Sequence, residues 1–268
     1  MLVTHEKKMD FLAALYNISI IEKLENFVKK ISKMKSTIQE IEERFDKDVE
    51  RFSQLETGQQ TTLDATFNME LITEGITRCY PQLRSVLDIG CGAGNYTVKL
   101  SQKMSNIDIT LLDLSQPMLD KALERVGDVT TGKVNMLKGD FRTADFGTEK
   151  YDVIIATAVL HHLRDDHDWE TAFKKLFSLL NDGGSIWIFD LVHQTDSDLQ
   201  QYIYHDLYGK YLVGLKDREY RDHVFAYIEK EDSPRSLMYQ LQLLEKVGFK
   251  KVDILHKNLC FASFVGFK

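Results

Sequence analysis

The 268-residue sequence has few of the residues that interrupt helices or cross-link small folds. It holds three cysteines, Cys79, Cys91 and Cys260, which are far apart and form no Cys-x-x-Cys pair. This spacing excludes a disulfide framework and a zinc knuckle as the basis of the fold. Only three prolines occur, none before Pro81, and no glycine precedes Gly58. The first fifth of the chain is therefore predicted to be helical.

Two further absences bear on partners and location. The sequence has no apolar run long enough to span a membrane and no signal-peptide pattern at its start. Lysine and arginine number 34 against 41 acidic residues, a net charge of −7. Such a balance disfavours broad binding to nucleic-acid phosphates. We expect a globular protein of the cytoplasm, with neither a membrane nor nucleic acid as partner.

The helical start carries a regular apolar pattern. Its apolar residues recur at steps of three and four, as in the seam of a coiled coil or helical hairpin: Ile20, Leu24, Phe27, Ile31, Met34, Ile38, Ile41 and Phe45. The stretch Ser36-Thr37-Ile38-Gln39-Glu40 contains a capping-box pattern, so two helices are as consistent with the pattern as one. We predict that residues 1–60 form a helical arm or cap. It packs on its own domain, closes a site as a lid, or joins two copies as a homodimer.

The rest of the chain alternates strands with helices. This rhythm predicts an α/β fold with a parallel sheet covered on both faces. Strands are expected at 85–89, 107–113, 133–138, 151–156 and 185–191, and an antiparallel pair at 249–256 and 260–267. Residues 61–268 are predicted to form one domain, with an inserted lid at about 195–240 that is rich in tyrosine and charge.

Three features at successive strand ends predict a nucleotide-like ligand. The first is the glycine turn Gly90, Gly92 and Gly94, where the main chain can approach a ligand closely. The second is Asp113, the last residue of the second strand, which can accept hydrogen bonds from ribose hydroxyls. The third is Gly139-Asp140-Phe141, where a carboxylate beside an aromatic ring suits an adenine.

NAD is the first alternative. Its fingerprint requires glycine at the sixth position of the turn, where this chain has Asn95. Asp88, Asp113 and Asp140 would also repel a pyrophosphate, whereas they suit a sulfonium and an amino group. The pattern therefore favours a ligand without phosphates.

The chain resembles the class I S-adenosylmethionine-dependent methyltransferases. The resemblance lies in VLDIGCGAGNYT (86–97), LLDLSQPMLDKA (111–122), GDF (139–141), YDVIIATAVLHHL (151–163) and LNDGGSIWIFD (180–190). It implies a Rossmann-like seven-stranded sheet with an antiparallel last strand, following the helical extension. It also implies S-adenosyl-L-methionine as cofactor, bound by Asp88, Gly90, Cys91, Gly92, Gly94, Asp113, Leu114, Met118, Gly139, Asp140, Phe141, Thr157 and Ala158.

Histidines follow the fourth strand, where the methyl group of the cofactor should point. His161 and His162 are the candidate catalytic residues, since an imidazole can remove a proton near neutral pH. Asp165, Asp166, His167 and Asp168 crowd the same loop, but their spacing is not that of a metal site, and we expect no metal.

The segment after the fifth strand supplies the residues predicted to bind the methyl acceptor. These are His193, Tyr208, Arg218 and Arg221. Tyrosines offer flat apolar walls and arginines bind carboxylates. A small aromatic or carboxylate-bearing acceptor follows as a hypothesis; the alternative is that the tyrosines only pack on the edge of the sheet.

Two stretches resemble a particular subgroup, the carboxy-S-adenosylmethionine synthases, which help to modify a wobble uridine in tRNA. They are FDKDVERF (45–52) and the carboxyl-terminal run 244–268. The chain departs from that subgroup at the turn Gly90–Gly94, where the synthases have Gly-Cys-Ser-Leu-Gly, and in its histidine pair. The main hypothesis is methyl transfer to a small molecule; the alternatives are a synthase-like transferase and a non-catalytic module that binds the cofactor.

Overall fold

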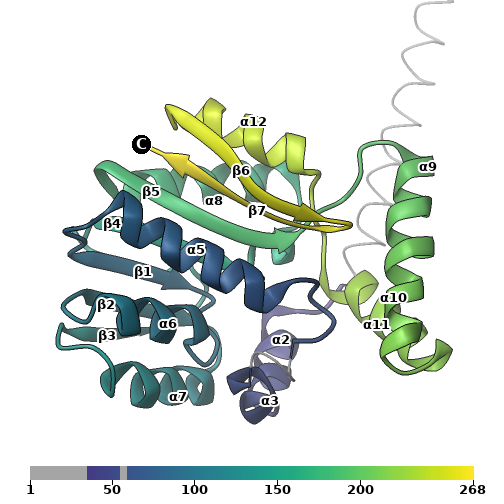
Figure 1. Ribbon diagram of the computed structural model, residues 1–268, viewed down its shortest axis with the longest axis horizontal. Helices are drawn as coiled ribbons and strands as arrows, with labels where there is room; N and C mark the ends of the chain where they lie inside the picture. Colours follow the sequence, from purple (N-terminus) through teal and green to yellow (C-terminus); the bar gives the residue numbers. More distant parts are fainter. Residues whose placement is uncertain (1–34, 55–58) are drawn as a thin grey trace, which may run out of the picture.

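The computed structural model describes residues 35–54 and 59–268. They contain one seven-stranded sheet with the order β3-β2-β1-β4-β5-β7-β6 (Figure 1). The strands are β1 (Ser85–Ile89), β2 (Asp108–Asp113), β3 (Val134–Lys138), β4 (Tyr151–Thr157), β5 (Leu180–Leu191), β6 (Lys251–Asn258) and β7 (Phe261–Phe267). Neighbours from β3 to β5 pair in parallel, and β7 is antiparallel to both β5 and β6. The predicted α/β class with an antiparallel last strand is confirmed.

Helices cover both faces of this sheet. They are α5 (Ala65–Cys79), α6 (Asn95–Lys103) and α7 (Gln116–Gly127) on one face, and α8 (Asp166–Leu179) and α12 (Leu237–Val247) on the other. Alternate residues of a strand face opposite sides of a sheet. Along β1, Val86 accordingly joins the core under α5 and α6, and Leu87 joins the core under α8. Each fully buried side chain of this size stabilises the fold by roughly 1.5–3 kcal/mol.

Local signals explain most of the element boundaries. Helix α8 begins at Asp166, because the Asp165 side chain accepts a hydrogen bond from the Asp168 amide and caps the helix. The strand expected at 185–191 also begins earlier, so that residues 181–184 are part of β5. Leu180 already pairs with Tyr151, the register then shifts, and Gly183 adopts a φ of +77° within the irregularity.

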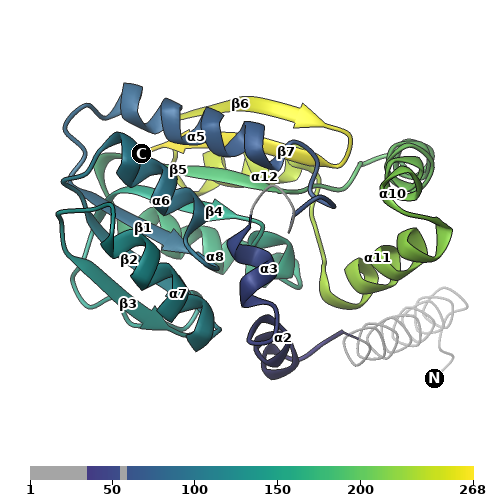
Figure 2. The ribbon, with the colours of Figure 1, turned by 60° about the horizontal axis from the view of Figure 1, so that its bottom comes forward.

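Two groups of helices lie outside the sheet and its covering layers. The first is α2 (Ile38–Phe45) with α3 (Val49–Ser53), and the second runs from α9 (Ser197–Gln200) through the π-helix η2 (Gln201–Tyr208) and α10 (Gly209–Leu215) to α11 (Arg218–Glu231). Figure 2 shows α2 and α3 near α7, with α10 and α11 farther along the same side of the molecule.

The capping box predicted before α2 is confirmed. The Thr37 hydroxyl accepts a hydrogen bond from the Glu40 amide, and the Glu40 carboxylate accepts one from the Thr37 amide. Most of the predicted apolar seam, from Ile20 to Met34, lies outside the described residues. No helix within 35–54 or 59–268 combines the length and apolar character needed to cross a bilayer.

Candidate functional site

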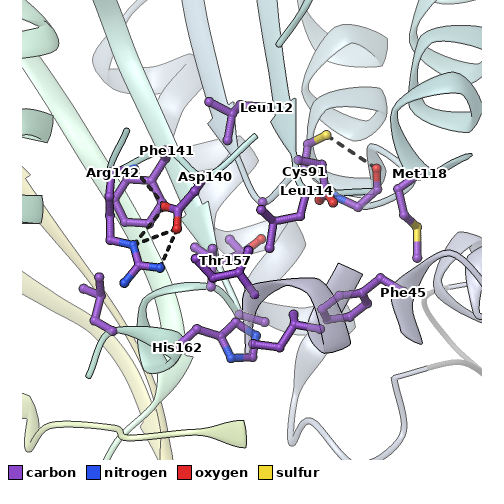
Figure 3. Close-up of a pocket in the computed structure, with 18 of the residues that line it drawn as sticks. Phe45, Cys91, Leu112, Leu114, Met118, Asp140, Phe141, Arg142, Thr157 and His162 are labelled. Carbon is purple, nitrogen blue, oxygen red and sulfur yellow. Dashed lines mark hydrogen bonds and ion pairs between the residues drawn. The ribbon is translucent and has the colours of Figure 1, made fainter. Parts of the chain in front are cut away.

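A cavity of about 560 Å³ lies at the carboxyl ends of the parallel strands (Figure 3). The strand order reverses between β1 and β4 at this place, which is where ligands bind in open α/β sheets. Figure 3 shows Asp140 and Phe141 toward one end of the cavity, Cys91 and Met118 toward the other, and His162 on the side away from the strand ends. Its volume is that of a small-molecule site.

The glycine turn after β1 brings bare main chain to the cavity. Gly90, Gly92 and Gly94 all have positive φ, of +63°, +51° and +76°. A Cβ on Gly90 would come within 2.6 Å of the Val159 side chain, so a larger residue cannot fit there. A Cβ on Gly92 would meet nothing within 4 Å, which shows that this residue faces open space. The turn therefore exposes its backbone to a ligand, as the sequence predicts.

Asp113 fixes the turn from the neighbouring strand. Its carboxylate accepts hydrogen bonds from the Gly92 amide at 2.8 Å and the Ser115 amide at 2.9 Å. Burial raises the pKa of Asp113 above its ordinary value, and the two amides oppose that rise. The carboxylate lies on the cavity wall beside Leu114 and Met118, where it can accept further hydrogen bonds from a ligand.

Asp88 lies behind the turn instead of in the cavity wall. It is 1% exposed, and its Oδ2 accepts a hydrogen bond from the Thr97 hydroxyl. Its other oxygen is buried without a hydrogen-bond partner. Burial raises the pKa of Asp88 to about 7. Asp88 and Gly94 are the two predicted cofactor residues that do not line the cavity.

At the opposite end of the cavity, Asp140 is held by an arginine. The Arg142 guanidinium forms ion pairs with Asp140 and, at 2.7 Å, with Asp168 of α8. Burial opposes ionisation of Asp140, but the bonds from Arg142 outweigh it and hold the pKa of Asp140 below its ordinary value. The Phe141 side chain is buried beside this pair. The carboxylate and ring predicted for an adenine are thus both present on the wall.

Residues 35–54 form the wall that faces the strand ends. Ile38, Ile41, Phe45 and Phe52 contribute apolar side chains to it. Phe45 and Phe52 are in ring contact, with centroids 5.4 Å apart. Because these side chains face the glycine turn across the cavity, the wall shields a bound ligand from water.

Specific polar contacts hold this wall in place. The Ser115 hydroxyl donates to Asp46 at 2.6 Å, and the Asn95 amide group donates to the Phe52 carbonyl at 2.7 Å. On the other side, Glu231 at the end of α11 accepts from Ser36 and pairs with Arg44, both at 2.6 Å. Glu231 is 3% exposed, so this pair is shielded from solvent. The wall is therefore attached to the sheet and to α11 alike.

The two predicted catalytic histidines take different positions. His162 lines the cavity, whereas His161 lies behind it and forms an ion pair with Asp190 of β5. Asp232, which follows α11, approaches both rings: its Oδ1 is 3.1 Å from His162 Nδ1 and 3.7 Å from His161 Nε2. The structure thus brings together two histidines and two buried acids.

The two imidazoles differ in their tendency to bind a proton. Burial disfavours the charge on His161, but Asp190 and Asp232 overcome it and raise the pKa of His161 to about 9. Burial and the adjacent His161 lower the pKa of His162, which Asp232 only partly opposes. Burial disfavours ionisation of Asp232, but the histidines hold its pKa below the ordinary value. At neutral pH the cavity therefore faces a neutral imidazole backed by a charged one.

The residues predicted to bind the acceptor do not line the cavity. Tyr208 is fully buried, and its hydroxyl donates to the Thr61 carbonyl at 2.8 Å. Arg221 pairs with its neighbour Asp222, and His193 forms an isolated bridge with Ser236. Arg218 is the first residue of α11, also outside the cavity wall. The tyrosines pack among themselves and against Phe225 and Phe261, in line with the alternative that they serve packing and not acceptor binding.

Asp232 and the 35–54 wall are the parts of the site that the sequence did not reveal. Asp232 lies 70 positions after His162, and no local spacing links the two. The capping box before α2 and the FDKDVERF stretch marked the wall as structured, but neither indicated that it faces the cavity. Only Ser233 of the predicted lid segment lies on the cavity wall.

Comparison with known proteins agrees with this geometry. Residues 86–184 match the model of the methyltransferase domain family. The carboxy-S-adenosyl-L-methionine synthase of Campylobacter jejuni is 25% identical over 213 residues, covering 75% of this chain and 84% of the synthase. The synthase of Helicobacter pylori is 28% identical over 188 residues, covering 68% of this chain and 75% of the synthase.

Solved structures share the fold. Human N-acetylserotonin methyltransferase, solved in complex with S-adenosylmethionine, superimposes with a TM-score of 0.58 at 15% identity, covering 91% of this chain and 66% of that protein. An O-methyltransferase family protein of Burkholderia thailandensis has a TM-score of 0.51 at 14% identity, covering 76% and 59%. The chain thus spans less than two thirds of the length of either solved protein.

The cavity walls suit the cofactor of this fold. They offer bare glycine backbone, the Asp113 carboxylate and the Asp140–Phe141 pair. The glycine turn itself holds no lysine or arginine that could bind a phosphate. Together with the match of residues 86–184 to the methyltransferase domain model, these features fit S-adenosylmethionine as the ligand of the cavity.

Proposed function

We propose that this protein transfers a methyl group from S-adenosyl-L-methionine to a small-molecule acceptor. The observation that supports this most is the cavity of about 560 Å³, which runs from the glycine turn to His162 and is covered by residues 35–54. A covered cavity of this size suits a small molecule better than a folded protein or a duplex.

The cofactor would be held by residues at the strand ends. The glycine-turn backbone and Asp113 are placed for its methionine and ribose parts, and Asp140 and Phe141 for its adenine, with Leu114, Met118, Gly139 and Cys91 completing the wall. Thr157, the last residue of β4, and Ala158, which follows it, line the cavity and would face the space between cofactor and acceptor. When bound, the cofactor supplies a methyl group made electrophilic by a sulfonium.

The acceptor would lie between the 35–54 wall and His162. Phe45, Phe52 and Phe189 give this part of the cavity apolar surfaces that exclude water and orient a ring or chain. His162 is the polar group at which the acceptor loses its proton. His161 does not touch the cavity and acts through its neighbours.

A synthase-like reaction is the second candidate, favoured by the similarity to the carboxy-S-adenosyl-L-methionine synthases. The structure weakens one part of it. Arg221, which we expected to bind a carboxylate, pairs with Asp222 away from the cavity. The main proposal therefore remains methyl transfer.

Calorimetry with S-adenosylhomocysteine tests the binding part of the proposal. We expect micromolar binding by the full chain and a loss of about 100-fold in Asp113→Ala, since a charged hydrogen-bond acceptor is removed from the site. Mass spectrometry of the nucleoside that copurifies with the protein separates the two candidates. The mass of S-adenosylmethionine supports the first, and an added carboxyl group supports the second. If the protein does not bind S-adenosylhomocysteine, both candidate functions are wrong.

The organisation of the whole chain is a further part of this proposal. We propose that residues 61–268 are the catalytic domain with its inserted segment, and that the predicted apolar seam of residues 1–60, most of which lies outside the described residues, joins two copies in the cytoplasm. Light scattering of the intact chain, compared with a chain in which Ile20, Leu24 and Phe27 are changed to Asp, tests the homodimer.

A further inference from the structure

His161, His162 and Asp232 form a cluster of metal-ligating side chains beside the cavity. One potential ligand atom from each residue lies within 4.8 Å of the other two. Two imidazoles and one carboxylate are a donor set that divalent transition-metal ions prefer. The cluster is assembled from two distant parts of the chain, the turn after β4 and the residue that follows α11.

The charges around the cluster call for a cation. Asp190 and Asp232 are 1% and 6% exposed. Among the residues that the structure describes, their ion pairs are with the two imidazoles alone. Lys35 approaches Asp232, but its ammonium group donates to the Asp232 main-chain carbonyl. Lys35 and Arg164 also interact electrostatically with Asp232. A metal ion bound at the histidines would add to the positive charge that compensates the two carboxylates.

Two atoms of the cluster also lack hydrogen bonds. His162 Nδ1 and Asp232 Oδ1 are buried with no hydrogen-bond partner in the described structure, although they are 3.1 Å apart. Buried polar atoms are nearly always satisfied, and these two are paired with each other only as an ion pair, so both can still take a shared ligand. A metal ion between them would bind both lone pairs.

The surroundings orient the third ligand. The Nδ1 atom of His161 contacts the Asp190 carboxylate, which leaves Nε2 directed toward Asp232. Asp190 is itself fixed by hydrogen bonds from the Leu160 and Leu191 amides at 2.7 Å. A carboxylate that holds the outer nitrogen of a ligating histidine is a recurrent arrangement around metal ions.

We propose that His161, His162 and Asp232 bind a divalent transition-metal ion of the zinc class at the acceptor side of the cavity. Three protein ligands leave one position open, and His162 and Ser233 place that position at the cavity wall. The heteroatom of the acceptor would occupy it. Such an ion would attract the electron pair of the acceptor's X–H bond, so that the proton would pass to solvent water instead of to His162 and the heteroatom would become a better nucleophile. The role of the ion in the reaction rests on the proposed function, whereas the binding of metal by these three residues is independent of it.

Metal binding is tested on the full-length chain after chelation and dialysis. Calorimetry with Zn²⁺ and visible absorption with Co²⁺ are measured for wild type, Asp232→Asn, His162→Gln and His167→Gln. His167 is exposed in the same part of the chain and lies outside the cluster, which makes it the matched control. S-adenosylhomocysteine binding by each variant reports whether the fold is intact.

We expect one equivalent of metal, a ligand-field spectrum for Co²⁺, and a loss of affinity of at least about 100-fold in Asp232→Asn and His162→Gln. His167→Gln should bind as wild type does. Failure of wild type to bind metal while it binds S-adenosylhomocysteine would overturn the proposal and leave His162 as a simple base. Equal binding by wild type and both cluster variants would overturn it too. Metal binding without S-adenosylhomocysteine binding would uphold the site and reject the proposed function.

Discussion

Residues 35–54 and residues 195–240 both lie outside the sheet, yet they relate to the cavity in different ways. The first segment places Ile41, Phe45 and Phe52 on the cavity wall, while the second contributes Ser233 alone. The sequence favoured the second, because its tyrosines and arginines look suited to a ligand. In the structure those tyrosines form their own core with Phe225 and Phe261. Aromatic content alone therefore does not distinguish a ligand wall from a packed helix group.

The largest effect is expected from a substitution at the contact between the two segments. Changing Glu231 to Ala removes the carboxylate that binds Ser36 and Arg44, and leaves the arginine without its buried partner. We expect a loss of about 3–5 kcal/mol in the free energy of unfolding, as for other broken buried pairs. Urea unfolding measures the loss. The exposed Glu229→Ala serves as control, and an equal effect of the two substitutions would contradict the role given to Glu231.

Asp88, which lies behind the glycine turn, gives a pH-dependent prediction that involves neither segment. The pKa of Asp88 is raised to about 7 by burial, from an ordinary value of 3.8. The folded state thus binds a proton that the unfolded state releases near pH 4, and stability falls as the pH rises from about 4 to 7. Asp88→Asn should abolish this part of the fall and be the more stable protein above pH 7, by on the order of 2–4 kcal/mol.

The difference between wild type and Asp88→Asn is measured by urea unfolding at several pH values. Asp182→Asn, at an exposed aspartate, is the control. A difference that does not change with pH would show that Asp88 is ionised at all these values in the folded protein.

Much of the fold could be predicted because its signals are local. Pro81 lies just beyond α5, Ser115 caps α7 and Gly248 ends α12. The strands were recognisable from apolar runs between such signals. For the same reason the glycine turn and Asp113 could be predicted as parts of one site, since parallel strands end at one edge.

The remaining parts depend on contacts between distant residues. Asp232 reaches His162 only because α11 returns toward the turn after β4, and no sequence spacing encodes that return. Arg142 forms an ion pair with Asp140, and the sequence alone did not predict this pairing. Tyr208 gives the same sequence pattern whether it faces a ligand or, as here, the Thr61 carbonyl.

The wall formed by residues 35–54 can be tested through a single ring. Phe45→Ala should weaken S-adenosylhomocysteine binding about tenfold, or ~1.4 kcal/mol, because part of the apolar wall is lost. Phe67→Ala, at a 53% exposed position on α5, should bind as wild type does. Equal affinities of all three proteins would mean that the wall does not contact the cofactor.

The smallest effect is expected in the second segment. Arg218→Ala combined with Arg221→Ala should change the affinity for S-adenosylhomocysteine, and the turnover of any acceptor that is found, by less than about twofold, since neither side chain lines the cavity. A large rise in KM for the acceptor would restore the original assignment of these arginines to substrate binding.

Hydrogen exchange with and without S-adenosylhomocysteine tests the central claim most directly, namely that the cofactor is enclosed between the strand ends and residues 35–54. The account predicts slower amide exchange on binding in the glycine turn and in α2 and α3, with η2 and α10 unchanged. Slower exchange confined to η2, α10 and α11, with α2 and α3 unaffected, would contradict it.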